Sequence, residues 1–421
     1  MKSDSTRLIL FVLAISLAAG FLLCGYEFIR STSSSIYLDV YGKENLPYAM
    51  LGGSVFTIVF LYGYGWMLSW VGPRRTLLFT SLFSCLVITL CYFAIQSGSN
   101  ISAWIIYSFR EAYIVVIIEQ YWSLINSTLK EREAKRYNGP ITGVGSLGAI
   151  AGGLIVGLIA ERVHTEPILL LAALSLIPAA ICSELSYRIG GEPSDEKRHE
   201  RKSLALSIFT DSSYLRRIAL LIFLTQIIST VLDLRFFGLV ADSIPARDER
   251  TAFIGNFYSS LNLVSGVLQF IIAPLLLSFI RLKFIHPAIP LIHIICGLIL
   301  IIRPSLFTGG LAYLVFKSLD YSIFRAGKEI FYIPLSYDSR YRAKEVIDAF
   351  VYRASKGISA GLVSLATMIL KAVPVSAYPF TAIISAIVWL VSVTGLVRQH
   401  DNILKSESST ANFFAQEEQK P

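Results

Sequence analysis

The sequence predicts an all-α polytopic membrane protein with twelve transmembrane helices in two six-helix halves. Of its 421 residues, 54% are hydrophobic and 16% are charged, whereas soluble domains carry about 25% charged residues. Mean hydropathy is +0.61, and the apolar residues come in blocks of about 20, the length that crosses roughly 30 Å of hydrocarbon. This composition excludes a soluble enzyme, a disordered scaffold and a secreted disulfide domain.

Twelve apolar blocks are long enough to cross a bilayer. The first follows the polar residues 1–7 and could pass for a signal peptide, but an uncleaved first helix fits better with eleven spans behind it. The predicted spans are 8–28, 48–70, 76–97, 103–127, 141–160, 166–187, 217–240, 254–279, 284–302, 307–332, 346–369 and 378–397. All five cysteines lie in apolar segments, without the spacing of a disulfide framework or a metal site.

The basic residues of the loops predict the orientation. With the N-terminus in the cytoplasm, 23 of the 37 basic residues fall in inside loops and termini. Only seven fall outside, namely Arg30, Lys43, Arg162, Arg247, Arg250, Arg303 and Lys371. Because Lys and Arg accumulate on the cytoplasmic side, both termini are expected in the cytoplasm. This asymmetry accounts for the net charge of +8 without a nucleic-acid partner.

A polar stretch divides the spans into two sets of six. We predict an N-terminal half over 1–188, a cytoplasmic linker over 189–216, a C-terminal half over 217–400 and a cytoplasmic tail over 401–421. A weak internal repeat supports this division, since Arg132-Glu133-Ala134-Lys135 recurs as Tyr341-Arg342-Ala343-Lys344, 209 residues later. Two parallel six-span halves resemble the major facilitator superfamily.

At least twelve ionisable residues inside the spans indicate a polar path through the bundle. A charge at the bilayer centre costs about 2.5–3.5 kcal/mol, so twelve of them facing lipid would cost on the order of 30 kcal/mol, several times a typical folding stability. We expect them to face one another or water, although buried ion pairs can also simply lock helices together. They are Arg110, Glu111, Glu119, Asp233, Arg235, Lys317, Asp320, Arg325, Lys328, Glu329, Arg353 and Lys356.

Helical spacing gathers these charges on single faces. At 100° per residue, Lys317, Asp320, Arg325 and Lys328 share an arc of about 140°, where three cations outnumber one carboxylate and favour an anion. The other predicted faces are Glu111, Glu119, Trp122 and Asn126; Gln226, Ser229, Thr230 and Asp233; and Asp348, Tyr352 and Lys356. The spans that carry these charges are 4, 7, 10 and 11, and Glu27 and Arg30 lie at the end of span 1. The resemblance to major facilitators implies a central cavity that is lined by helices 1, 4, 7 and 10. The repeat maps Glu119 onto Lys328, which predicts a pair in the empty cavity.

One motif has two interpretations. Gly143-Val144-Gly145-Ser146-Leu147-Gly148 matches the G-x-G-x-x-G nucleotide fingerprint, but it opens a membrane span instead of following a strand. The same segment carries small residues four apart, such as Gly148 and Gly152, which let helices approach closely. We therefore favour helix packing, and we expect no metal, no cofactor and no catalytic group.

A more specific run lies at residues 318–335, Ser318-Leu319-Asp320-Tyr321-Ser322-Ile323-Phe324-Arg325-Ala326-Gly327-Lys328-Glu329-Ile330-Phe331-Tyr332-Ile333-Pro334-Leu335, followed by Ala343-Lys344-Glu345-Val346-Ile347-Asp348. It resembles the nucleotide transporter (ATP/ADP translocase) family of plastids and intracellular bacteria. The resemblance implies ATP/ADP exchange on a major-facilitator scaffold, with Lys328 as the functional lysine and Glu111 or Glu119 as the functional glutamate. Ser33 stands where the family has a lysine, which identifies a divergent member.

The resulting expectation is a nucleotide antiporter and not an enzyme. Its small anionic substrate is ATP or ADP, its other partner is the lipid bilayer, and it is a monomer in the bacterial inner membrane. A transporter of another anion, coupled to protons through Glu111, Glu119, Asp233 or Asp320, remains the alternative, and a non-transporting receptor is a third. The predicted substrate-binding residues are Lys328, Arg325, Lys317, Asp320, Glu119, Glu111, Arg30, Arg353, Lys356, Asp233, Tyr321 and Trp122.

Overall fold

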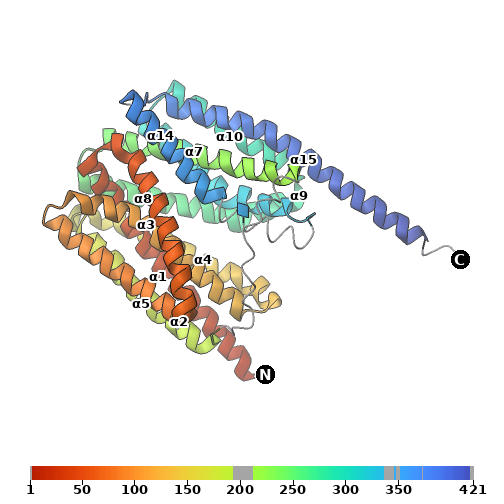
Figure 1. The fold of residues 1–421 in the computed structure, drawn as a ribbon, viewed down its shortest axis with the longest axis horizontal. Helices are drawn as coiled ribbons and strands as arrows, with labels where there is room; N and C mark the ends of the chain where they lie inside the picture. The colour runs from red at the N-terminus through yellow and green to blue at the C-terminus, as the bar shows by residue number, and fades with distance from the viewer. Residues whose placement is uncertain (1, 193–211, 336–345, 348–350, 372, 418–421) are drawn as a thin grey trace. The chain divides into compact units, whose positions relative to one another are not determined.

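The predicted all-α membrane fold class is confirmed. The computed structural model describes residues 2–192, 212–335, 346–347, 351–371 and 373–417, and these contain helices and no strand (Figure 1). Within these residues, nine helical segments are long and apolar enough to cross a membrane. One of them, Lys43–Gln96, covers two predicted spans. Further helices cover the spans predicted at 307–332 and, in part, 346–369, so the described helices are consistent with twelve spans.

The helices follow one another with short connections. The first part of the chain forms α1 (Lys2–Tyr41), the short turn η1 (Lys43–Asn45), α2 (Leu46–Gln96), α3 (Asn100–Thr128), α4 (Glu131–Val163) and α5 (Pro167–Gly190). The second part forms α7 (Ser213–Ser243), α8 (Arg247–Val267), η3 (Leu268–Ile272), α9 (Ala273–Phe279), α10 (Leu282–Ile302), α11 (Leu306–Leu319), η4 (Asp320–Phe324), α12 (Arg325–Phe331), α14 (Tyr352–Leu370) and α15 (Ala377–Glu417).

The described helices cluster into two compact units. Unit 1 contains residues 1–199, 240–266 and 363–372, and unit 2 contains residues 200–239, 267–362 and 373–421, in each case over the described part of the range. Most of the predicted linker, residues 193–211, lies outside the described residues. The division into halves at 189–216 stays a prediction.

Helix α1 extends to Tyr41, well past the predicted end at residue 28. The polar residues 31–35 are all buried inside it. Their hydroxyls bond back to the helix, since Thr32 donates to the carbonyl of Phe28 at 2.7 Å and Ser33 donates to that of Ile29 at 2.5 Å. Such bonds satisfy buried hydroxyls without ending a helix. Arg30 therefore lies within α1 and not in the predicted loop.

Helix α2 covers the second and third predicted spans because the connection between them is a kink. Gly72 has φ 79° and ψ 169°, a backbone conformation outside the helical region, and Pro73 follows it. Glycine adopts positive φ without a steric penalty, and proline at the start of a helical segment needs no hydrogen-bond donor. The predicted loop at 71–75 is thus reduced to a sharp change of direction.

The glycines of α4 confirm the packing interpretation of the G-x-G-x-x-G match. A Cβ atom on Gly148 would lie 2.2 Å from the carbonyl oxygen of Gly20, and one on Gly152 would lie 2.5 Å from that of Cys24, both in α1. A Cβ on Gly153 would lie 2.7 Å from the carbonyl oxygen of Gly255 in α8. Only glycine allows backbones to approach this closely.

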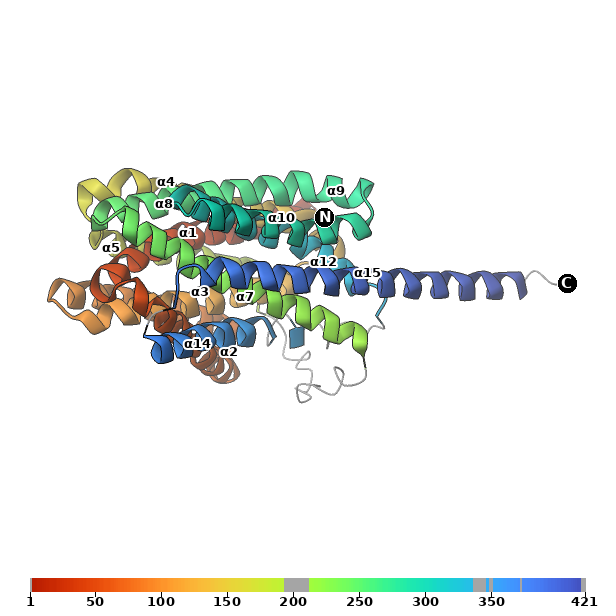
Figure 2. The ribbon, with the colours of Figure 1, turned by 90° about the horizontal axis from the view of Figure 1, so that it is seen from above.

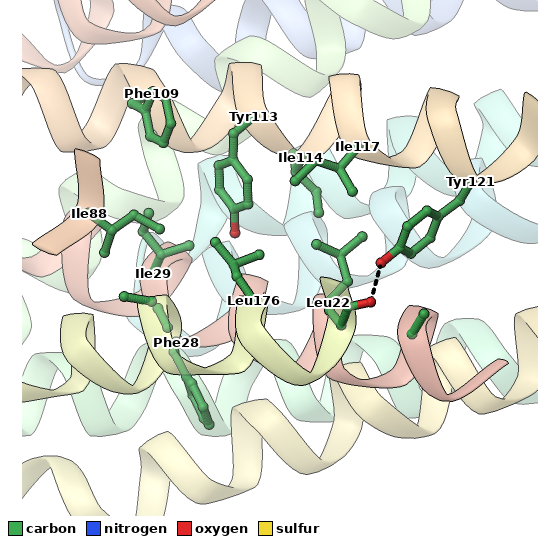
Figure 3. Close-up of a cluster of buried hydrophobic side chains, with 14 of the residues drawn as sticks. Leu22, Phe28, Ile29, Ile88, Phe109, Tyr113, Ile114, Ile117, Tyr121 and Leu176 are labelled. Atoms are coloured by element: carbon green, nitrogen blue, oxygen red, sulfur yellow. Dashed lines mark hydrogen bonds between the residues drawn. The ribbon is translucent and has the colours of Figure 1, made fainter. Parts of the chain in front are cut away.

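A cluster of buried apolar side chains forms the core of unit 1. It joins α1 through Leu22 and Ile29, α3 through Tyr113 and Ile117, and α5 through Leu176. Figure 3 shows these side chains meeting between the helices. At one end of the cluster the hydroxyl of Tyr121 accepts a hydrogen bond from Ser183 at 2.9 Å, so this buried phenol has a polar partner.

The corner between α7 and α8 is held in unit 1 by charged side chains. Arg247 pairs with Glu166 at 2.6 Å, and the carboxylate of Asp248 accepts a hydrogen bond from the hydroxyl of Thr165 at 2.6 Å. Arg250 is buried and donates to the hydroxyl and the carbonyl of Ser35 at 3.1 and 3.0 Å. The beginning of α8 is therefore fixed to the end of α1 and to the α4–α5 connection.

In unit 2, α10 packs against α15 and α11. Helix α15 lies along α10 (Figure 2). The side chain of Ile383 in α15 is so close to Gly297 of α10 that a Cβ there would lie 2.6 Å from it. At one end of this unit, Tyr214 of α7 donates a hydrogen bond to the carbonyl of Phe331 at 2.8 Å and lies 3.0 Å from Nδ1 of His400. These contacts fix the end of α12.

Candidate functional site

Lys317 is the central cation of the candidate site in unit 2. Its side chain is buried, and its ammonium group donates to the hydroxyl of Ser229 in α7 at 2.7 Å. The ammonium lies 5.6 Å from the ring centroid of Tyr321 and 5.7 Å from that of Tyr313. The structure thus brings together the charged face of the tenth predicted span and the hydroxyl-bearing face of the seventh.

Carboxylates and further cations surround Lys317. Asp233 and Asp320 both act electrostatically on its ammonium group, and Asp320 also interacts with Arg325 and Lys328. Lys317 and Lys328 are each only 9% exposed, whereas Arg325 is exposed. Two buried ammonium groups near a carboxylate in a low-dielectric region attract oxyanions more strongly than the same groups in water.

The charged face of this span is not a regular helical stripe. Residues Asp320–Phe324 form η4, a π-helical turn between α11 and α12. The count of 100° per residue does not hold across a π-helical turn, so the arc predicted for Lys317, Asp320, Arg325 and Lys328 stays a prediction. In the described residues η4 packs against a second π-helical turn, η3. Such turns occur frequently at functional sites.

Asp233 and Thr230 continue the polar face of α7. The Oδ1 atom of Asp233 and the hydroxyl of Thr230 are buried and have no hydrogen-bond partner among the described residues. Arg353 and Lys356, both half-buried, lie on α14. Asp348, which was expected on the same stripe as Lys356, lies outside the described residues.

Arg110 is the most enclosed cation of unit 1. Its guanidinium donates through Nη1 to the carbonyl of Arg30 at 2.7 Å and to the hydroxyls of Ser33 and Ser34 at 2.9 and 2.5 Å. It also lies 3.6 Å from Glu111. Ser33, the position where the resembling family has a lysine, therefore contacts a cation supplied by α3. The sequence placed Arg110 inside a span but not in the site, because the spacing within one helix does not predict partners in another.

Arg30 lies beside this group, among residues that the site prediction did not include. Its guanidinium carbon lies 3.3 Å from the ring centroid of Tyr258, and its Nη1 donates to Glu27 at 3.1 Å. Glu27 also accepts a hydrogen bond from Asn262 at 2.9 Å. The sequence signal for Glu27 was its position three residues before Arg30 on one helix face, but nothing in the sequence indicated the two residues of α8.

The predicted acidic face of α3 has residues in different environments. Glu111 and Trp122 are half-buried, and Glu119 is exposed. Glu119 lies in unit 1 and Lys328 in unit 2, so their predicted pairing stays a prediction. The choice between Glu111 and Glu119 as the functional glutamate also stays open.

Comparison with known proteins shows which family the chain resembles. The sequence model described as "TLC ATP/ADP transporter" matches residues 181–400, more than half of the chain. The chain belongs to the TLC ATP/ADP transporter family. The matched segment contains Lys317, Asp320 and Lys328, and the predicted resemblance to ATP/ADP translocases is confirmed.

The named relatives of this chain are distant from it in sequence. The "ADP,ATP carrier protein 3" of Rickettsia bellii is 21% identical over 356 residues, which cover 71% of this chain and 69% of that protein. The protein of the same name from Rickettsia conorii is 22% identical over 364 residues, which cover 74% and 73%. The chain is thus a divergent member, as the sequence predicted.

Solved structures share the fold of this TLC family member. The nucleoside transporter NupG matches with a TM-score of 0.63 and 13% identity over 94% of this chain and 99% of that chain. The transporter PepTSo of the POT family matches with a TM-score of 0.64 and 14% identity over 92% and 98%. At these identities the likeness concerns the fold, which is the major-facilitator-like fold that the sequence predicted.

Proposed function

We propose that this protein exchanges nucleotides of the ATP/ADP class across a membrane by alternating access. The observation that carries the proposal is the family match over residues 181–400, because it contains the buried lysines Lys317 and Lys328. The names of the Rickettsia relatives agree with this substrate class. A membrane transporter needs no chemical step, so the site has only to bind and release an anion.

The candidate residues divide into three roles. Cations would bind the phosphates, because charge-assisted hydrogen bonds to oxyanions are about twice as strong as neutral ones. Carboxylates would hold the cations when no substrate is bound, and aromatic rings would stack on the base. The cations are Lys317, Arg325, Lys328, Arg30, Arg353 and Lys356; the carboxylates are Asp233, Asp320, Glu111 and Glu119; and the aromatics are Tyr321 and Trp122.

The setting of this transport is also a proposal. We propose that the protein acts as a monomer in the bacterial inner membrane. The excess of basic residues in one set of loops supports an orientation with both termini in the cytoplasm. Alternating access would move a half at 1–188 against a half at 217–400, as in transporters built from two repeats.

A second candidate is transport of another anion driven by protons. The observation that favours it is the buried Oδ1 atom of Asp233, which has no hydrogen-bond partner among the described residues. Asp233 would then carry the driving proton, and Lys317 would still bind the anion.

Uptake by purified protein in lipid vesicles separates the two candidates. Labelled ATP is added outside vesicles that are loaded with ADP, empty, or empty with a pH gradient. Exchange predicts fast uptake only into ADP-loaded vesicles. Uptake driven by the pH gradient alone contradicts exchange and supports the second candidate, as does uptake of other anions when no nucleotide is transported.

A further inference from the structure

We propose that Glu27 is a positioning residue that sets how strongly Arg30 binds the phosphates of the substrate. The inference rests on the proposed nucleotide exchange, in which Arg30 is one of the phosphate-binding cations. The carboxylate of Glu27 accepts a hydrogen bond from the guanidinium of Arg30. A phosphate must compete with this carboxylate in order to bind Arg30.

Glu27 is buried, and its carboxylate accepts hydrogen bonds from Arg30 and Asn262. The residue is 1% exposed. Its Oε1 atom accepts hydrogen bonds from Nη1 of Arg30 at 3.1 Å and from Nδ2 of Asn262 at 2.9 Å. Its Oε2 atom is buried and has no hydrogen-bond partner among the described residues. Glu27 is therefore too enclosed to contact a substrate directly, and it acts through Arg30.

The Arg30 side chain is the more accessible member of the pair. It is 12% exposed, against 2% for the side chain of Glu27. Its guanidinium carbon lies 3.3 Å from the ring centroid of Tyr258 and 5.6 Å from that of Tyr26. A guanidinium has five N–H donors in one plane, and the bond to Glu27 uses Nη1. A phosphate that approaches Arg30 would therefore meet a guanidinium that packs against Tyr258.

The carboxylate weakens this cation for any other anion. In a low-dielectric region a negative charge about 3 Å away strongly reduces the attraction of a guanidinium for a phosphate. Glutamine at position 27 keeps the shape and the acceptor oxygen but removes the charge. The Glu27→Gln variant should therefore bind nucleotide more tightly both in the initial complex and in the transition state of transport. Such uniform tightening lowers KM and slows the release of the nucleotide. A residue that only stabilises the fold would not lower KM.

The test measures ATP/ADP exchange by the full chain in ADP-loaded vesicles. We expect Glu27→Gln to lower KM for labelled ATP about tenfold, which corresponds to about 1.4 kcal/mol, and to lower the maximal rate. Glu27→Asp keeps the charge and should keep KM within about threefold of the wild type, a change below about 0.7 kcal/mol. Glu161→Gln, the same substitution at an exposed position of α4, is the matched control and should change neither parameter.

A second variant guards against a Glu27→Gln protein that fails to fold. Asn262→Ala removes the neutral donor that shares the carboxylate of Glu27, so the carboxylate engages Arg30 more strongly and KM should rise. An unchanged or higher KM in Glu27→Gln, or an unchanged or lower KM in Asn262→Ala, overturns the inference while exchange by the wild type stands. Absence of exchange in the wild type overturns the proposed function, and the role of Glu27 falls with it.

Discussion

Two glycines of α4 allow a matched test of how closely this helix packs against α1. A Cβ atom at Gly148 would lie 2.2 Å from the carbonyl oxygen of Gly20 and 2.8 Å from its carbonyl carbon, while one at Gly143 would meet nothing within 4 Å. Because contacts below 3.0 Å are essentially absent for real Cβ atoms, Gly148→Ala must displace backbone. Overpacking of this kind costs about 1–3 kcal/mol. Both substitutions gain about 0.5–1 kcal/mol of helix propensity.

The difference between the two variants isolates the packing cost. The propensity gain cancels, so the free energy of unfolding should be about 1–3 kcal/mol lower for Gly148→Ala than for Gly143→Ala. Thermal unfolding of both proteins in the same detergent, followed by near-ultraviolet circular dichroism, measures it. We expect Gly148→Ala to unfold below the midpoint of Gly143→Ala, which should equal or exceed that of the wild type. Equal midpoints for the two variants would refute the close approach of α4 and α1.

Two further predictions concern buried polar contacts. Arg250→Leu removes charged hydrogen bonds to Ser35 and should lower the free energy of unfolding by about 1.5–3 kcal/mol. The control Arg162→Leu, at an exposed position, should stay within about 0.5 kcal/mol of the wild type in the same thermal unfolding experiment. Equal midpoints for the two variants would contradict the contact between Arg250 and Ser35. Tyr214→Phe leaves the carbonyl of Phe331 without its hydroxyl donor and should cost about 1–3 kcal/mol, measured as a lower denaturation midpoint; an unchanged midpoint would show that the bond contributes nothing.

The length and polarity of the helices could be predicted because hydrophobic blocks must match the bilayer. The prediction failed at the end of α1, where a run of hydroxyl residues looked like a loop. Those hydroxyls bond to carbonyls of their own helix, and Arg110 and Arg250 of other helices bond to the same run. A scale that assigns one value to each residue type cannot include partners that come from elsewhere in the fold.

The candidate site was predictable in composition but not in geometry. Helical spacing identified the face of α7 that carries Ser229 and Asp233, and Ser229 indeed contacts Lys317. The π-helical turn at η4 was not predictable, because its contact with η3 depends on tertiary packing. The same reason explains why the contact of Asn262 with Glu27 was missed, since these residues are 235 positions apart in the sequence.

The rate of ATP/ADP exchange by Lys328→Gln tests most directly whether the buried cations of unit 2 carry nucleotide transport. Lys328 is 9% exposed, and losing a charged hydrogen bond to phosphate costs about 1.5–3 kcal/mol. We expect labelled ATP uptake into ADP-loaded vesicles to fall about tenfold or more in terms of kcat/KM, since each 1.4 kcal/mol is a factor of ten. Lys283→Gln, at an exposed position of α10, should exchange at the wild-type rate. Equal exchange by Lys328→Gln and the wild type would contradict the account.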